Sequence, residues 1–284
     1  MPQLRNDIRN DRSRSRLPFI SMTDTDVATN VLHNADAPWN AFSSYDYWCR
    51  NYRVLQPEDQ EIIRLVSQFF MSAFADRPPA RRAIDVGSGT NLYPALLMLP
   101  WAEQILLTDY SKSNIGWLHE QLADDASPWT WQPFWHEMLA AAKDYGEVDS
   151  PRKMLREACV SVPGYSGIEQ CSVFGLPEAE WDLGTMFFVA ESITTKPAEF
   201  RDAVERFFGA LRPGAPFATA FMAGSKGYEV AETVFPAVPV NSEDIRRHFT
   251  ELGADGLAVE VLQTKHRVRD GYAGMIVATG FARS

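Results

Sequence analysis

The chain has 284 residues, of which 45% are hydrophobic, 23% charged and 12% aromatic, and its formal net charge is −10. These proportions are typical of a folded protein with a sizeable core, and they exclude collagen, a coiled coil and wholesale disorder. An acidic chain repels polyphosphates, so we do not expect a nucleic-acid-binding surface.

The start of the chain does not have the pattern of a secretory signal. Residues 1–16 contain five arginines and two aspartates, and no apolar run follows them. We therefore predict a disordered arm over residues 1–25 and a cytoplasmic protein. The longest apolar stretch, residues 95–107, is interrupted by a proline and a glutamate and is too short to span a bilayer. No membrane attachment and no protein partner are indicated.

The cysteines and histidines, which are the residue types that most often bind metals, are scattered along the sequence. The three cysteines, Cys49, Cys159 and Cys171, are an odd number and have no paired spacing. The five histidines are isolated from one another and from the cysteines. Because metal sites need clustered ligands and disulfide frameworks need paired cysteines, we expect neither in this protein.

Hydrophobic spacing predicts alternating helices and strands after Pro57. Such alternation is typical of an α/β protein whose doubly wound, mostly parallel sheet is wrapped by helices. The predicted helices cover residues 62–73, 92–99, 114–122, 154–160, 198–211 and 242–252, and the predicted strands cover residues 82–87, 104–109, 181–189, 217–222, 257–263 and 274–280. For the last helix, Ser242 is the expected N-cap and Gly253 the expected C-cap.

No repeat or low-complexity linker divides the chain, so we expect a single domain over residues 26–284. Residues 26–56 are predicted to form an N-terminal helical cap, and residues 127–167 an insertion in the α/β order. Four aromatic residues crowd together between positions 129 and 135. Large rings dominate packing energies, so we expect this cluster to belong to the core.

A glycine turn between a strand and a helix is the sharpest local signal. Residues 85–91 read DVGSGTN, in which Gly87 and Gly89 allow the backbone to approach a ligand closely. Asp109 ends the next predicted strand, 20 residues after Gly89, where an acid can accept both hydroxyls of a ribose. A dinucleotide site requires a third glycine, but position 92 is Leu. S-adenosylmethionine, which has no pyrophosphate, fits the turn and the acid.

Residues 83–93 resemble the first motif of the small-molecule methyltransferases that include phenylethanolamine, nicotinamide and thioether methyltransferases. The likeness extends over roughly residues 45–280, and the site pattern is most similar to that of the phenylethanolamine enzyme. It implies a Rossmann-like class I methyltransferase that uses S-adenosylmethionine. Further matching segments are residues 46–52, 107–111 with Asn114, 129–133, 211–214 and 239–240.

The resemblance also implies a set of cofactor contacts. Tyr47, Tyr52, Gly87, Ser88, Gly89, Thr90 and Tyr93 correspond to residues around the methionine part of the cofactor, Asp109 to the ribose ligand, and Tyr110 and Asn114 to residues beside the adenosine.

Two positions of the cofactor set depart from the family pattern. Ser172, before Val173, replaces an aspartate that reaches the adenine amine, and serine keeps a hydrogen-bond acceptor without the charge. Phe187 falls in a cofactor wall where relatives have smaller residues.

Three residues match positions near the acceptor. Glu191 and Asp270 correspond to acids that contact the substrate amine in the phenylethanolamine enzyme, and Tyr228 to a tyrosine near the acceptor pocket. We expect methyl transfer to a small molecule, with an amine nitrogen as the favoured acceptor and Glu191 and Asp270 as the catalytic acids. Transfer to carbon, sulfur or oxygen on the same fold, and cofactor binding without catalysis, are the alternatives.

Overall fold

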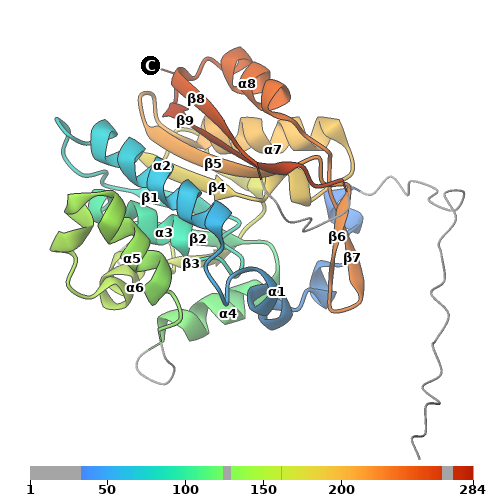
Figure 1. The fold of residues 1–284 in the computed structure, drawn as a ribbon, viewed down its shortest axis with the longest axis horizontal. Helices are drawn as coiled ribbons and strands as arrows, with labels where there is room; N and C mark the ends of the chain where they lie inside the picture. The colour runs from blue at the N-terminus through green and yellow to red at the C-terminus, as the bar shows by residue number, and fades with distance from the viewer. Residues whose placement is uncertain (1–32, 124–128, 161, 264–270, 284) are drawn as a thin grey trace, which may run out of the picture. The chain divides into compact units, whose positions relative to one another are not determined.

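The computed structural model describes residues 33–123, 129–160, 162–263 and 271–283. The predicted arm over residues 1–25 and the predicted acceptor ligand Asp270 lie outside the described residues. Seven strands of the described part form one sheet in the order β3-β2-β1-β4-β5-β9-β8 (Figure 1). The strands are β1 (Ala83–Val86), β2 (Ile105–Asp109), β3 (Ile168–Gln170), β4 (Leu183–Phe187), β5 (Pro216–Ala223), β8 (Asp255–Leu262) and β9 (Gly274–Phe281).

The direction of the strands confirms the predicted mostly parallel α/β class. β1 pairs in parallel with both β2 and β4, and β3 and β5 extend the sheet in parallel on either side. β9 runs antiparallel to β5 and to β8. The strand order reverses at β1, and in open sheets of this kind ligands bind outside the carboxyl ends of the strands at such a reversal.

Helices cover both faces of the sheet because the strands are apolar on both sides. In β2, Ile105 and Leu107 pack into one cluster and Leu106 into the other. The first cluster includes α2 (Pro57–Ala73), α3 (Tyr93–Met98), α4 (Lys112–Leu122), α5 (Gln132–Ala141) and α6 (Pro151–Val160), and the second includes α7 (Pro197–Ala210) and α8 (Ser242–Glu251).

The segment between α4 and β3 contains more helix than the sequence predicts. α6 corresponds to the predicted helix at residues 154–160, whereas α5 and the 3₁₀-helix η4 (Lys143–Glu147) are additional. Trp131, Phe134 and Trp135 are buried, and Trp129 is partly buried against the same core, which confirms that this aromatic cluster packs into the core. The boundaries of the proposed insertion stay a prediction.

An N-terminal segment packs against a small hairpin. The segment comprises the 3₁₀-helices η1 (Asn34–Asp36) and η2 (Trp39–Ala41), followed by α1 (Ser44–Asn51). The hairpin, β6 (Gly227–Val230) and β7 (Thr233–Pro236), is absent from the sequence-based prediction. Phe42 and Phe235 meet edge to face at 5.2 Å, and the blue segment lies beside the orange hairpin in Figure 1.

Three predicted boundaries need correction. Asn241, not Ser242, is the N-cap of α8, because its side chain accepts a hydrogen bond from the backbone N–H of Asp244. Leu252 is the C-cap, and Gly253 follows it at φ +82°. The predicted strand over residues 181–189 is shorter, since β4 ends at Phe187 and Phe188 has φ +61°.

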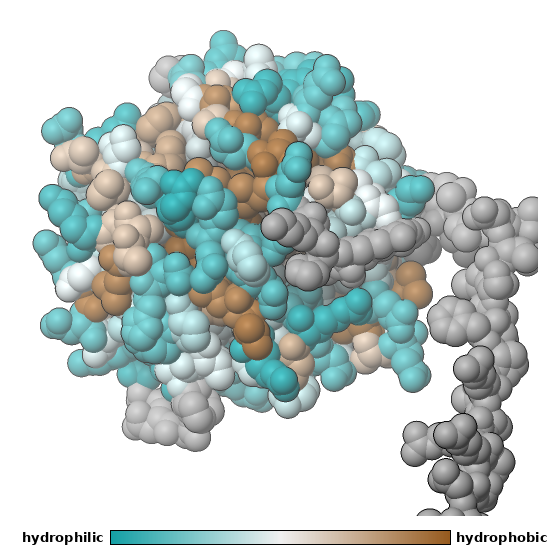
Figure 2. Space-filling model, viewed as in Figure 1, coloured by the Kyte–Doolittle hydropathy of each residue, from teal (hydrophilic) through white to brown (hydrophobic). Residues whose placement is uncertain are grey.

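None of the helices in the part that the structure describes is both long and apolar enough to cross a bilayer. On the face drawn in Figure 2, hydrophobic residues lie in several small areas separated by hydrophilic ones.

Candidate functional site

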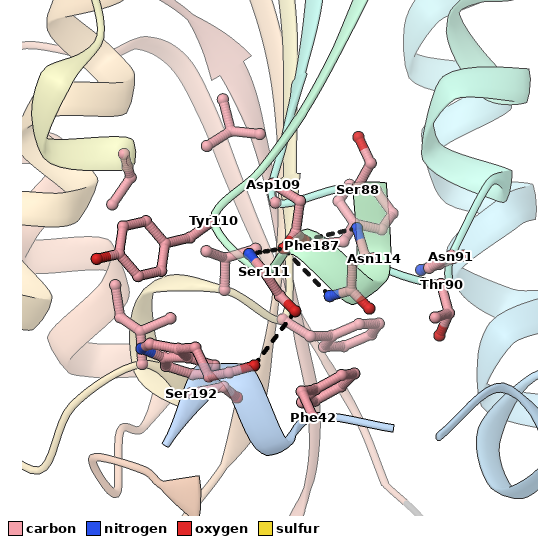
Figure 3. Close-up of a pocket in the computed structure, with 18 of the residues that line it drawn as sticks. Phe42, Ser88, Thr90, Asn91, Asp109, Tyr110, Ser111, Asn114, Phe187 and Ser192 are labelled. Carbon is pink, nitrogen blue, oxygen red and sulfur yellow. Dashed lines mark hydrogen bonds between the residues drawn. The ribbon is translucent and has the colours of Figure 1, made fainter. Parts of the chain in front are cut away.

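A pocket opens where β1, β2 and β4 end, at the reversal of strand order (Figure 3). We call it the loop pocket, because the glycine turn that follows β1 forms part of its wall. Its lining residues are Asn34, Trp39, Phe42, Tyr47, Tyr52, residues 86–91, residues 109–111, Asn114, residues 171–173, residues 187–189, Ser192, Ile193 and Tyr228.

The glycine turn has a backbone that other residues adopt only with strain. Gly87 and Gly89 have φ values of +67° and +53°. A Cβ at position 87 would also collide with the side chain of Val189. Glycine at these positions therefore brings the bare backbone to the pocket wall, as the sequence predicts.

Asp109 lies at the centre of the polar side of the loop pocket (Figure 3). Its carboxylate accepts hydrogen bonds from the backbone N–H of Gly89 at 2.9 Å, from that of Ser111 at 2.7 Å and from the Asn114 side chain at 3.1 Å. Burial raises the pKa of Asp109 to about 6, against the lowering effect of these donors. The acid thus ties the glycine turn to the end of β2 and stays ionised at neutral pH.

Two buried polar atoms of the turn have no hydrogen-bond partner among the described residues. They are Oγ1 of Thr90 and Nδ2 of Asn91, and both residues line the loop pocket with less than a tenth of their surface exposed. Buried polar atoms are normally satisfied, so these two indicate a polar ligand group at the turn. A hydroxyl and an amide suit the carboxylate and ammonium of an amino acid such as the methionine part of S-adenosylmethionine.

The rest of the loop pocket is largely aromatic. Tyr47, Tyr52, Phe187 and Tyr228 contribute rings to its wall. A positively charged sulfonium is attracted to ring faces, so this wall suits the reactive end of the same cofactor.

The opposite end of the pocket has the residues predicted beside the adenosine. Ser172 and Val173 line it, and the Ser172 hydroxyl accepts a hydrogen bond from the backbone N–H of Phe174 at 3.3 Å. Tyr110 also lines the pocket and remains 46% exposed. An apolar valine and a ring beside a neutral hydroxyl provide a surface on which a flat base can lie.

The structure brings together all the predicted cofactor residues except Tyr93. Tyr93 is fully buried and does not line the loop pocket, and its hydroxyl donates a hydrogen bond to Asp59 at 3.2 Å. Its ring stacks on Phe134 at 5.5 Å. Tyr93 follows the glycine turn in sequence, as the motif requires. In the structure it is the first residue of α3, and its side chain packs into the core and not against the loop pocket.

Sequence reasoning missed the N-terminal residues Asn34, Trp39 and Phe42, which also line the pocket. The hydroxyl of Ser113 donates a hydrogen bond to the Phe42 carbonyl at 2.8 Å, and Ser44 donates one to the Asn114 side chain at 2.8 Å. These contacts fasten the N-terminal segment to α4. No pattern in the sequence of residues 33–42 predicts them, because their partners are about 70 positions away.

Glu191 lies in the 3₁₀-helix η6 (Ala190–Ser192) and is 0% exposed. It does not line the loop pocket, although its neighbour Ser192 does. Its Oε1 accepts a hydrogen bond from the backbone N–H of Met222 at 2.9 Å. Tyr228, the other described residue that is predicted to lie near the methyl acceptor, is in the pocket wall and donates a hydrogen bond to the Ser192 carbonyl at 3.3 Å.

A second pocket adjoins the loop pocket and shares Tyr52 and Phe188 with it. We call it the α2 pocket, because the first turn of α2 forms one side. The left-handed conformation of Phe188 turns the chain sharply after β4, at the boundary between the two pockets. Strained residues of this kind are concentrated at functional sites. The lining residues are Arg50, Asn51, Tyr52, Gln56, Glu58, Asp59, Phe188, Met222, Tyr272 and Met275.

The sequence matches the model of the NNMT/PNMT/TEMT family over residues 30–278, which is most of the chain. The chain belongs to this family. It is an S-adenosylmethionine-dependent methyltransferase of small molecules with a Rossmann-like class I fold, and the predicted family and cofactor are confirmed.

Individual relatives are distant. Human nicotinamide N-methyltransferase is 25% identical over 220 residues, which cover 75% of this chain and 81% of the relative. Human phenylethanolamine N-methyltransferase is 25% identical over 178 residues, 61% of this chain and 62% of the relative. Among solved structures, a magnesium protoporphyrin IX methyltransferase from Synechocystis with bound S-adenosylmethionine is 15% identical with a TM-score of 0.49, covering 87% of this chain and 93% of the other.

Proposed function

We propose that this methyltransferase acts on the nitrogen of a small amine and that the acceptor occupies the α2 pocket. The observation that supports this proposal is the pair of adjoining pockets. One has the polar and aromatic groups that suit the cofactor. The other has two carboxylates, Glu58 and Asp59, and one cation, Arg50, together with amide, aromatic and methionine side chains. Two relatives are N-methyltransferases by name, which agrees with a nitrogen acceptor.

In this proposal the loop pocket contacts all three parts of the cofactor, namely the methionine, the ribose and the adenine. Thr90 and Asn91 bind the methionine end, Asp109 binds the ribose, and Ser172 and Val173 lie against the adenine. When bound, S-adenosylmethionine supplies an electrophilic methyl group on a positively charged sulfur. Tyr47, Tyr52 and Phe187 surround that end and exclude water from it.

The role of the protein in the transfer is chiefly to align the acceptor. Holding two reactants in line contributes up to about 7–11 kcal/mol in well-oriented systems. Tyr52 and Phe188 border both pockets, so in this proposal they set the distance between the acceptor and the methyl group of the cofactor. The N-terminal segment, through Trp39 and Phe42, covers the loop pocket from the side of the hairpin.

An acceptor screen tests this function. The protein is incubated with S-adenosylmethionine labelled in its methyl group and, separately, with arylalkylamines, pyridines, thioethers, phenols and activated carbon acids. Mass spectrometry of the products identifies the methylated atom. We expect transfer to an amine nitrogen. Preferential transfer to sulfur, oxygen or carbon would show that the proposed acceptor class is wrong. Tight binding of S-adenosylhomocysteine without transfer to any compound would contradict catalysis.

A further inference from the structure

The α2 pocket contains a buried acid that the family resemblance does not assign. Asp59 is only 2% exposed and lies at the start of α2, three positions after the N-cap Gln56. It lines the α2 pocket beside Glu58, and the same pocket borders the loop pocket at Tyr52 and Phe188. The Asp59 carboxylate therefore lies in the pocket that we propose for the acceptor, next to the pocket that we propose for the cofactor.

The surroundings of Asp59 fix its position and favour its neutral form. The Tyr93 hydroxyl from α3 donates a hydrogen bond to Oδ1 at 3.2 Å. The pKa of Asp59 is raised to about 7, chiefly by burial; the hydrogen bonds from Tyr93 and the Gln56 backbone oppose this rise, and the negative charge of Glu58 adds to it. The ordinary pKa of an aspartate is far below this value, so Asp59 is a much stronger proton acceptor than a surface acid.

Amines need such a group. An alkylamine is largely protonated at neutral pH, and its nitrogen can attack only after a proton has left. We propose that Asp59 is a catalytic residue that binds the ammonium group of the acceptor in the α2 pocket and takes its proton. This inference rests on the proposed amine acceptor.

The step is a simple proton transfer. One N–H bond of the ammonium breaks, an O–H bond forms on the Asp59 carboxylate, and the electron pair stays on nitrogen as the lone pair that attacks. The proton returns to water when the product leaves. Besides Glu58 and Tyr93, the described charged or titratable groups around the pocket are Arg50 and Tyr52 from the α1 side and Tyr272. Arg50 also donates a hydrogen bond to the Glu229 carbonyl at 3.1 Å.

Asp59 could instead serve only to stabilise the start of α2, and this structural role can be distinguished from proton transfer by experiment. Acids are common in the first turn of a helix, where they interact with free N–H groups and the helix dipole. Asparagine at position 59 keeps an oxygen that can accept from Tyr93 and from the Gln56 backbone, but it has neither charge nor basicity. Asp59→Asn thus separates the chemical role from the structural one.

The probe is 2-phenylethylamine, with its affinity measured by calorimetry from pH 6 to 9 in the presence of S-adenosylhomocysteine. In the native protein we expect the affinity to rise as the pH passes through about 7, because the ionised carboxylate attracts the ammonium. Asp59→Asn should abolish this rise. In methyl-transfer assays with the same amine it should lower kcat/KM about 100-fold and remove the acidic limb of the pH profile.

Two further variants complete the test. Glu61→Gln removes an acid two positions further along, on the exposed side of α2, where Glu61 pairs with Arg64, and it should keep the native pH profile. Tyr93→Phe removes the hydroxyl that lowers the pKa of Asp59, so the acidic limb should move to higher pH.

Each failure has its own meaning. An Asp59→Asn variant with the native amine affinity and acidic limb overturns the role of Asp59. Equal losses of affinity for amine and for S-adenosylhomocysteine indicate a helix-start role and also overturn it. If the native protein binds the amine with the expected pH dependence but methylates no amine, the proposed function fails while the contact with Asp59 stands. A native protein that does not bind the amine overturns both.

Discussion

Asp109 acts at the scale of a single residue by linking two loops that follow neighbouring strands. It accepts hydrogen bonds from the Gly89 and Ser111 backbones, and it lines the loop pocket, where we propose that the cofactor binds. Because burial raises its pKa to about 6, its charge is lost just below neutral pH. Cofactor binding should therefore depend on pH in a range where surface aspartates stay ionised.

We expect Asp109→Asn to weaken binding of S-adenosylhomocysteine by roughly tenfold or more, since a hydrogen bond to a charged group contributes about 1.5–3 kcal/mol. In the native protein, affinity should fall as the pH decreases through about 6, because protonation removes the charged acceptor. The variant should lose this pH dependence. Calorimetry checks both effects, and Asp202→Asn, on the exposed side of α7, serves as the control. An Asp109→Asn variant with native affinity would show that the ribose is held elsewhere.

Glu191 is predicted as an acceptor ligand by the family resemblance, but in the structure it lines neither pocket and accepts a hydrogen bond from the backbone N–H of Met222. Glu191→Gln keeps the shape of the side chain and an oxygen for the Met222 N–H, but removes the charge. Met222 lines the α2 pocket, so we expect a raised acceptor KM with unchanged cofactor affinity. Steady-state kinetics with varied acceptor measures the change. An unchanged KM would show that Glu191 does not contact the acceptor and only holds the end of β5 in place, so that Asp59 would be the acid that binds the acceptor.

At the scale of secondary-structure elements, the strand–turn–helix unit of β1 and α3 depends on glycine. Gly87→Ala places a Cβ against Val189 in a backbone conformation at φ +67°. We expect a lower melting temperature, from a cost of about 1–3 kcal/mol, and weaker cofactor binding. Differential scanning calorimetry and cofactor titration measure the two effects.

A glycine in a helix provides the matched control. Gly116 lies in the middle of α4, is exposed, and has no atom within 4 Å of an added Cβ. Gly116→Ala should therefore stabilise the protein by about 0.5–1 kcal/mol, because alanine is the better helix former. If both substitutions had the same effect on stability, the special backbone of the turn would not be the reason for glycine at position 87.

At the scale of the whole molecule, three buried acids couple stability to pH. Burial raises the pKa values of Asp59 and Asp85 to about 7 and that of Asp109 to about 6, all from an ordinary value of 3.8. The folded state therefore binds more protons than the unfolded state between about pH 4 and pH 7. Their stabilising contribution is complete below pH 4 and is lost as the pH rises through the folded pKa values.

Asp85→Asn isolates one of these contributions. Asp85 is in β1, does not line either pocket, and accepts a hydrogen bond from Thr185 at 2.6 Å. Native protein should lose more stability than the variant between pH 5 and pH 8, because only the native acid must ionise while buried. Melting temperatures of both proteins across this range provide the measurement. Parallel curves would mean that Asp85 keeps its proton throughout or titrates normally.

Local sequence determined the elements that form one side of the site. A β-branched run, two glycines and a helical pattern specify a strand, a turn with positive φ values and a helix. The parallel β–α–β connection then places Asp109 at the same edge of the sheet as Gly87 and Gly89. Gly87, Gly89 and Asp109 could be predicted because they follow from this short-range unit, whereas Ser88, Thr90, Tyr110 and Asn114 were predicted as cofactor contacts only from the family resemblance.

Tertiary structure alone decided the other side of the site. Trp39 and Phe42 reach the pocket by packing on Phe235, almost 200 positions later, in a hairpin whose two-residue turn at Ala231 and Glu232 lacks the usual glycine. The same holds for the buried position of Glu191 and for the contact between Asp59 and Tyr93. Hydrophobic periodicity reports which face of an element is buried, but not which distant element covers that face, because that depends on how all the layers pack together.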